Sequence, residues 1–236
     1  MAVFFNKTAY LVLLSLAIQT YGFGQLDVVS KSSLFRRQLS AGKEEGLVEL
    51  KRMIPSIRYD LRYATQQNFT GKRLYPPNSQ FSFLRLTAAK GLQSVAEDLS
   101  KQGLGIVVWD AYRPYRVTVK FWKLIHDERY VANPSKGSGH NRGIAIDLTL
   151  YDLKSGILLD MPTDFDDFSE KAHHGYPNLT PLQIKNREIL KYTMEKYHFI
   201  SFDTEWWHYS WPDPKKYSIL DLSFDELSKL DDASEK

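Results

Sequence analysis

The sequence predicts a single domain of the α+β class, and three observations support this. The length of 236 residues allows one sizeable hydrophobic core, or at most two small ones. Hydrophobic residues make up 43% and charged residues 25% of the chain, which is an ordinary globular composition. Predicted strands and helices follow one another without strict alternation, which favours α+β over a doubly wound parallel sheet.

The chain begins with the pattern of a secretory signal peptide, predicted to span residues 1–24. One lysine precedes the apolar run Ala9–Ile18, and Gly22 and Gly24 suit the positions before a cut at Gln25. We therefore expect export to the periplasm or the medium, with no stable membrane insertion after cleavage. An uncleaved membrane anchor and a buried N-terminal helix are the alternatives.

Three further regions follow along the chain. Residues 25–47 are polar, lack a clear period and are expected to form an N-terminal arm or linker. The main domain is predicted to span 48–212. The polar segment 213–236 is expected to be a tail with one short helix.

The first half of the main domain contains one clear helix and one clear strand. Residues 59–71 are expected to be extended and to end in a glycine turn. Apolar residues at helical spacing predict a helix over 87–102, and Gly103 suits its end. The run LGIVVWD predicts a buried strand over 104–110, and a helix is expected over about 117–126.

The second half starts with a predicted strand over 143–153, a turn and a returning strand over 157–161. Residues 164–178 have no regular pattern. Thr180, followed by a proline and then a glutamine at the third position, is a helix start of capping-box type. The aromatic-rich segment 199–211 is expected to be the final strand.

Charge and cysteine content exclude several classes of function. The net charge is only +3 and no stripe of Lys or Arg stands out, so there is no case for nucleic-acid binding. The chain has no cysteine, so it forms no disulfide and carries no lipid on an N-terminal Cys. Any metal site must therefore use His, Asp and Glu side chains.

The stretch SGHNRGIAIDLTL places His140 in a glycine-rich loop and Asp147 in the apolar strand that follows. A buried, unpaired carboxylate is costly, so Asp147 needs a partner. The segment EWWH adds His208, and two His with one carboxylate are ligands of the kind that hold a catalytic zinc with an open fourth position. Taken singly, the histidine could be a surface residue and the aspartate could simply be hydrogen-bonded.

Glu205 precedes His208 by three residues, and it is the candidate general acid/base. Residues three apart on a strand point to opposite faces. A bulge or the end of the strand is therefore needed to bring these two side chains together.

These stretches resemble a known family. SGHNRGIAID fits the motif S-x-H-x-x-G-x-A-x-D, and EWWH fits E-x-W-H, of the zinc D-Ala-D-Ala peptidases. Together with RYATQQNFTG, WDAYRP and FDDFSEKAHH, they resemble the VanX-type D-alanyl-D-alanine dipeptidases. The resemblance implies a hedgehog/DD-peptidase-like fold, with a central antiparallel sheet and flanking helices.

The resemblance also implies roles for individual residues. One zinc ion per chain would be held by His140, Asp147 and His208, with Glu205 as general acid/base. Arg113 would stabilise the charge on the scissile carbonyl oxygen, although "YRP" is also compatible with a plain turn. Ser138 and Asp166 are expected to help hold the substrate ammonium and backbone, and Tyr63 is expected to line the pocket. For Asp166 and Tyr63 a purely structural role is the alternative.

The implied function is hydrolysis of D-alanyl-D-alanine, or a similar short D-amino-acid dipeptide, in peptidoglycan metabolism. A carboxypeptidase or endopeptidase acting on stem peptides, and a non-catalytic zinc protein on the same fold, are the rival interpretations. The expected partner is a small dipeptide, and the sequence does not indicate an oligomeric state.

Ala111 replaces the usual glycine before "YRP". His173 and His174 are expected to be rim or structural residues.

Overall fold

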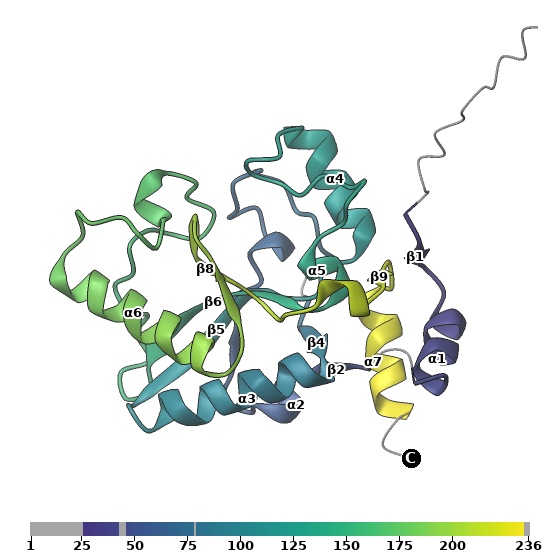
Figure 1. Ribbon diagram of the computed structural model, residues 1–236, viewed down its shortest axis with the longest axis horizontal. Helices are drawn as coiled ribbons and strands as arrows, with labels where there is room; N and C mark the ends of the chain where they lie inside the picture. Colours follow the sequence, from purple (N-terminus) through teal and green to yellow (C-terminus); the bar gives the residue numbers. More distant parts are fainter. Residues whose placement is uncertain (1–25, 43–45, 78, 234–236) are drawn as a thin grey trace, which may run out of the picture.

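The fold is centred on a five-stranded sheet with the order β3–β5–β6–β8–β7. Figure 1 labels its strands β5, β6 and β8. The computed structural model describes residues 26–42, 46–77 and 79–233, so the predicted signal peptide lies outside it. Only β3 and β5 are parallel, and the other neighbours are antiparallel. The strands are β3 Arg58–Tyr59, β5 Leu104–Asp110, β6 Ala145–Asp152, β7 Ile200–Phe202 and β8 Glu205–Ser210. The α+β class and the central, mainly antiparallel sheet are confirmed.

The two central strands are buried along almost their whole length. Every residue of β5 is buried, as is every residue of β6 except Asp152. Continuous apolar runs such as these form strands when both faces of a sheet are covered. Both strands were therefore recognisable in the sequence, and β5 has the predicted bounds.

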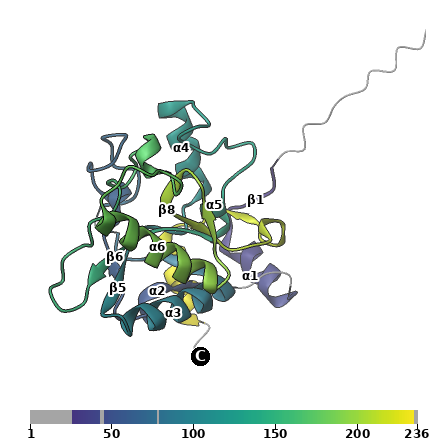
Figure 2. The same cartoon turned by 60° about the vertical axis from the view of Figure 1, so that its left-hand side comes forward.

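Helices α3 Leu86–Ser100 and α6 Pro181–Lys196 lie side by side over one face of the sheet (Figures 1 and 2). α3 buries Leu92, Val95 and Leu99, as its spacing predicts. α6 begins with the predicted capping box, in which Thr180 and Gln183 exchange side-chain-to-backbone hydrogen bonds.

The opposite side of the sheet carries shorter helices and long loops. α4 Tyr115–Ile125 is the helix predicted over about 117–126, and α5 Gly139–Arg142 lies just before β6. Two short 3-10 turns, η1 Arg62–Ala64 and η2 Glu170–Ala172, lie in the loops. Among the described residues, no helix is long and apolar enough to cross a membrane.

The N-terminal and C-terminal segments pack against each other. β1 Val28–Val29 pairs in parallel with β9 Ile219–Leu220, and α1 Ser32–Ser40 contacts α7 Phe224–Ala233. α7 is the short helix predicted in the tail. A second small sheet joins β2 Leu47–Glu49 to β4 Phe83–Arg85, and α2 Leu50–Met53 follows β2 directly. The 3-10 turn η3 Pro214–Lys216 lies before β9. Strands of two or three residues carry no period, which is why these elements were not predicted.

Three predicted elements differ from the structure. The returning strand over 157–161 is reduced to one bridge between Tyr151 and Leu158, because Ile157 and Leu158 project from the fold and are exposed. The segment 199–211 is a hairpin of β7 and β8 rather than one strand. Most of 59–71 forms η1 and turns instead of an extended segment, and the Asn68 side chain hydrogen-bonds to the backbone of that turn.

The C-terminal segment contributes to the hydrophobic core. Phe224 is 5% exposed, and its ring packs edge-on against Tyr75 with a centroid distance of 5.0 Å. Tyr112 donates a hydrogen bond to the Leu222 carbonyl oxygen and accepts one from the Leu222 amide. The segment after residue 213 is therefore part of the folded domain.

We predict that Phe224→Ala lowers the free energy of unfolding by about 3–5 kcal/mol, because it leaves a cavity in the core. Tyr192→Ala is the matched control, because that ring is 69% exposed on α6. Chemical denaturation of both variants is the measurement. Equal stability of the two variants would show that the tail does not support the core.

Candidate functional site

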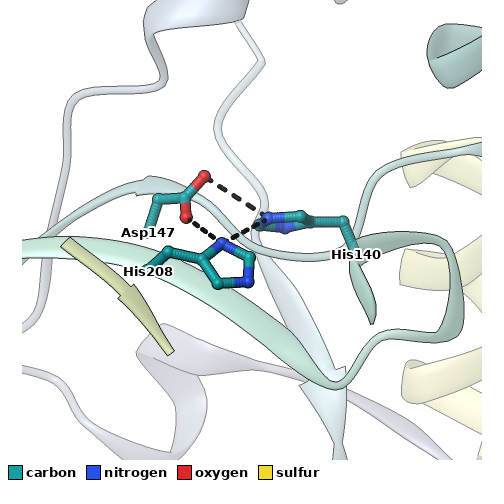
Figure 3. Close-up of side chains that lie close together, drawn as sticks. All are labelled: His140, Asp147 and His208. Atoms are coloured by element: carbon teal, nitrogen blue, oxygen red, sulfur yellow. Dashed lines mark hydrogen bonds and ion pairs between the residues drawn. The ribbon is translucent and has the colours of Figure 1, made fainter. Parts of the chain in front are cut away.

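Three candidate metal ligands come together from three different elements (Figure 3). Antiparallel pairing of β6 with β8 sets Asp147 directly beside His208. His140 comes from α5, whose N-terminus is capped by the Ser138 side chain. Gly143 ends that helix with a φ of 70°, a conformation that favours glycine. The predicted triad is therefore assembled by a capped single-turn helix next to a strand pair.

The distances within the triad suit one metal ion. His140 Nε2 lies 3.3 Å from His208 Nδ1 and 3.4 Å from Asp147 Oδ2. The distance from His208 Nδ1 to Asp147 Oδ1 is 2.8 Å. Ligands at about 2.0–2.2 Å from a tetrahedral zinc are about 3.3–3.6 Å apart. Two of the three spacings therefore already match a tetrahedral site, and the third needs only a small widening.

Each histidine has its second ring nitrogen directed away from the triad. His140 Nδ1 lies 2.7 Å from the Ala111 carbonyl oxygen, so this nitrogen carries the proton and donates it. His208 Nε2 lies 3.3 Å from Ser210 Oγ. Burial is the main cause that lowers the pKa of both histidines. Both rings are therefore neutral at neutral pH, and the Ala111 carbonyl leaves the Nε2 lone pair of His140 facing the triad.

The Asp147 carboxylate lacks a basic partner. In the described part of the chain it contacts the two imidazole rings and no Lys or Arg side chain. It is only 3% exposed, and burial, followed by repulsion from Asp110, raises its pKa well above the usual value. A divalent cation between the three side chains would supply the missing positive charge.

Glu205 reaches the triad from the start of β8. Its Oε2 lies 4.0 Å from His208 Nδ1, close enough to face the site without being a member of the ligand set. The pairing of β7 with β8 is irregular between Ser201 and Phe202, where β7 meets Glu205. This irregularity at the strand end meets the requirement for bringing Glu205 and His208 together. Burial raises the pKa of Glu205 to about 6, and the nearby His208 opposes the rise.

Arg113 follows β5 and lies in the same cleft, so it is not part of a plain surface turn. Its guanidinium lies over the rings of Tyr63 and Phe121, at 5.3 and 4.9 Å from their centroids. Its Nε donates to Asp110 at 2.8 Å. Burial is the largest single influence and lowers the pKa of Arg113, but Asp110, Tyr63, Tyr75 and Asp147 together outweigh it and raise the pKa well above its usual value. The side chain is therefore a fixed cation.

Asp110 is a site residue that the sequence reasoning missed. It is 1% exposed, and it accepts hydrogen bonds from Arg113 and from the Tyr75 hydroxyl. The sequence feature that could have found Asp110 is the same one that identified Asp147: a single carboxylate in an otherwise apolar strand. The two carboxylates are register partners on β5 and β6.

The predicted substrate-binding residues have different surroundings. The Tyr63 hydroxyl donates to both Asp166 oxygens, at 3.0 and 3.1 Å. Asp166 lines the cleft and adopts a left-handed backbone conformation with a φ of 61°. Ser138 also lines the cleft, but its hydroxyl accepts the Asn141 amide as a helix cap. Ser138 therefore helps to hold α5, and its substrate-binding role stays a prediction.

All the candidate residues except Asp110 line one cleft of about 770 Å³. His173 lies on its wall, and His174 is buried with no hydrogen bond to either ring nitrogen. The rim and structural roles expected for these two residues agree with this placement. Aromatic residues form much of the remaining wall, which includes Phe69, Phe121, Tyr130, Phe168, Phe202 and Trp207.

Known proteins resemble this chain over most of its length. A family model described as D-Ala-D-Ala dipeptidase, peptidase M15, matches residues 43–227. A D-alanyl-D-alanine dipeptidase of Escherichia coli K12 is 35% identical over 174 residues, or 74% of this chain and 89% of that protein. Another, from Enterococcus faecium, is 36% identical over 186 residues, or 70% and 91%. Among solved structures, VanYB in complex with D-alanine-D-alanine matches with a TM-score of 0.38 and 13% identity, over 66% of this chain and 81% of that one.

We predict that the chain binds one equivalent of a divalent transition metal and that His140→Ala loses this binding. His173→Ala is the matched control, because His173 lies in the same cleft but outside the triad. Metal analysis after dialysis, together with the melting temperature with and without added metal, is the measurement. Stoichiometric metal in His140→Ala, or loss of metal in His173→Ala alone, would contradict this assignment.

Proposed function

The chain belongs to the D-Ala-D-Ala dipeptidase family, peptidase M15, and we propose that it hydrolyses D-alanyl-D-alanine to two molecules of D-alanine with one bound zinc ion. The observation that carries the proposal is the meeting of the triad, Glu205 and Arg113 in a single cleft. A structural metal site would need neither an acid/base at its edge nor a buried arginine beside it.

His140 Nε2, His208 Nδ1 and the Asp147 carboxylate would hold the metal, which when bound supplies a Lewis acid and an activated water. Two neutral imidazoles and one carboxylate, with no thiolate, are a ligand set used by catalytic zinc sites. The hydrogen bonds from His140 to Ala111 and between His208 and Ser210 fix the two rings in the ligating orientation.

Glu205 transfers the proton in this scheme. Water adds to the carbonyl carbon, the bond from that carbon to the amide nitrogen breaks, and the nitrogen must gain a proton to leave as an amine. Glu205 takes a proton from the attacking water and delivers it to that nitrogen. A pKa of about 6 suits both steps near neutral pH, because the carboxylate can accept a proton and also give it back.

Arg113 stabilises the negative charge that develops on the carbonyl oxygen. It is a cation held against two aromatic rings and a carboxylate, so it does not have to reorganise during the reaction. A preorganised donor of this kind contributes about 2.7–4 kcal/mol to transition-state stabilisation.

Asp166 and Tyr63 are the groups suited to the substrate ammonium. The cleft contains the Asp166 carboxylate, and the Tyr63 hydroxyl fixes its orientation through two hydrogen bonds. An anion at this place would pair with the free amino group of a dipeptide. This pairing favours a dipeptidase over a carboxypeptidase, whose substrates have no amino group next to the scissile bond.

The biological role we propose is recovery of D-alanine from D-Ala-D-Ala released during peptidoglycan turnover. The predicted signal peptide supports this role, because an exported enzyme would not reach the cytoplasmic pool used for wall precursors.

We predict that Glu205→Gln retains the metal and the fold but lowers kcat by at least about 10²-fold, because the amide cannot carry the proton. Glu195→Gln, on the outer surface of α6, is the matched control and should keep wild-type turnover. Metal content, melting temperature and turnover of D-Ala-D-Ala should be measured on the same samples. A metal-loaded Glu205→Gln variant with nearly wild-type kcat would remove Glu205 from the mechanism.

The free amino group of the substrate should also matter. We predict that N-acetyl-D-Ala-D-Ala is hydrolysed far more slowly than D-Ala-D-Ala, and that Asp166→Asn reduces this preference. The kcat/KM values for both substrates with both proteins are the measurement. Equal turnover of the acetylated and free dipeptides by the wild-type protein would instead favour the carboxypeptidase function.

A further inference from the structure

Asp110 is the most buried charged group near the cleft whose part in the reaction is unexplained. It ends β5, three residues before Arg113, and does not itself line the cleft. Its carboxylate is 1% exposed. Burying a carboxylate at this depth is costly, and one cation beside it offsets part of that cost. We therefore ask what the buried Asp110 carboxylate contributes to the structure of the cleft.

The contacts of Asp110 fix the orientation of the Arg113 guanidinium. Asp110 Oδ2 lies 2.8 Å from Arg113 Nε and 2.7 Å from Nη2, so it engages both donors on one edge of the group. This paired geometry sets the plane of the guanidinium as well as its position. The same Oδ2 lies 3.7 Å from His140 Nδ1, on the side of that ring away from the triad.

Asp110 is itself held in place from the other side. The Tyr75 hydroxyl donates to Asp110 Oδ1 at 2.5 Å, and Tyr75 is 3% exposed. The Tyr75 ring packs edge-on against Tyr63, with a centroid distance of 5.9 Å, beneath the Arg113 guanidinium. The chain Tyr75–Asp110–Arg113 therefore runs from the core to the cleft.

We propose that Asp110 is a positioning residue, which holds the Arg113 guanidinium in the plane that presents its remaining edge to the substrate carbonyl oxygen. The inference rests on the proposed function, because it assigns Arg113 to the developing oxyanion. Asp110 touches neither the substrate nor the metal in this scheme and acts through Arg113. Its contribution should therefore appear in kcat and should require Arg113.

The test compares Asp110→Asn with Asp221→Asn, in the wild-type background and in Arg113→Gln. Asparagine retains the size of the side chain and one acceptor oxygen, but it removes the negative charge that pairs with Arg113 and one of the two oxygens, Oδ2 and Oδ1, that accept from Arg113 and Tyr75. Asp221 is the matched control, because it binds Arg116 Nε at 2.9 Å outside the cleft. We expect Asp110→Asn to lower kcat for D-Ala-D-Ala by about tenfold or more, with KM and metal content nearly unchanged. In the Arg113→Gln background it should cause no further loss, and Asp221→Asn should leave kcat unchanged in both.

Three outcomes would overturn the proposal. These are a wild-type kcat in Asp110→Asn, an equal loss of kcat in both backgrounds, and a loss that follows metal content. Should Asp110→Asn fail to fold, Tyr75→Phe removes only the hydroxyl that holds Oδ1. It should still lower kcat by about twofold to tenfold in the wild-type background and not in Arg113→Gln.

A second readout separates this proposal from the proposed function. The Arg113 Nε–H signal in a ¹⁵N–¹H NMR spectrum should be protected from solvent exchange in the wild type and lose that protection in Asp110→Asn. An unprotected signal in the wild type overturns the positioning role even in an active enzyme. An inactive wild type with the expected change in protection would refute the dipeptidase function while leaving the Asp110–Arg113 geometry supported.

Discussion

The site depends on a carboxylate buried in a central strand without a basic partner. Asp147 sits on β6 between Ile146 and Leu148, which are fully buried, and its side chain contacts the two imidazoles of His140 and His208. An isolated charge in such a place is unfavourable unless a cation joins it. The pairing of β6 with β8 and the helix that presents His140 bring three side chains close enough together to hold a cation there.

The surrounding residues follow from the same constraint. β5 and β6 pair so that Asp110 lies beside Asp147, and two buried carboxylates side by side need positive charge on both flanks. A metal ion in the triad would supply the positive charge on one flank, and Arg113 supplies it on the other, since Arg113 binds Asp110. In the proposed mechanism the same Arg113 guanidinium lies where the carbonyl oxygen needs stabilising. The stability of the buried carboxylates and the proposed catalysis would then depend on one arrangement of charges.

Much of this could be predicted from the sequence, because local signals coincide with the long-range structure. In SGHNRGIAID, Ser138 caps α5 and Gly143 ends it in the left-handed conformation. The apolar run that follows continues as β6. The unpredicted parts depend on contacts between distant segments. The irregular pairing that turns Glu205 towards His208 involves β7, and the core position of Phe224 depends on Tyr75 and Phe83. Asp110 carried the same local signal as Asp147, but its partner Tyr75 lies 35 residues earlier in the chain.

The most direct test of the central claim is a crystal structure of the zinc-loaded protein, with anomalous data collected on both sides of the zinc absorption edge. The account predicts one strong anomalous peak per chain within about 2.0–2.2 Å of His140 Nε2, His208 Nδ1 and an Asp147 oxygen. Glu205 should approach this peak without binding it. A peak at His173 or elsewhere, or an empty triad in zinc-saturated crystals, would contradict the account.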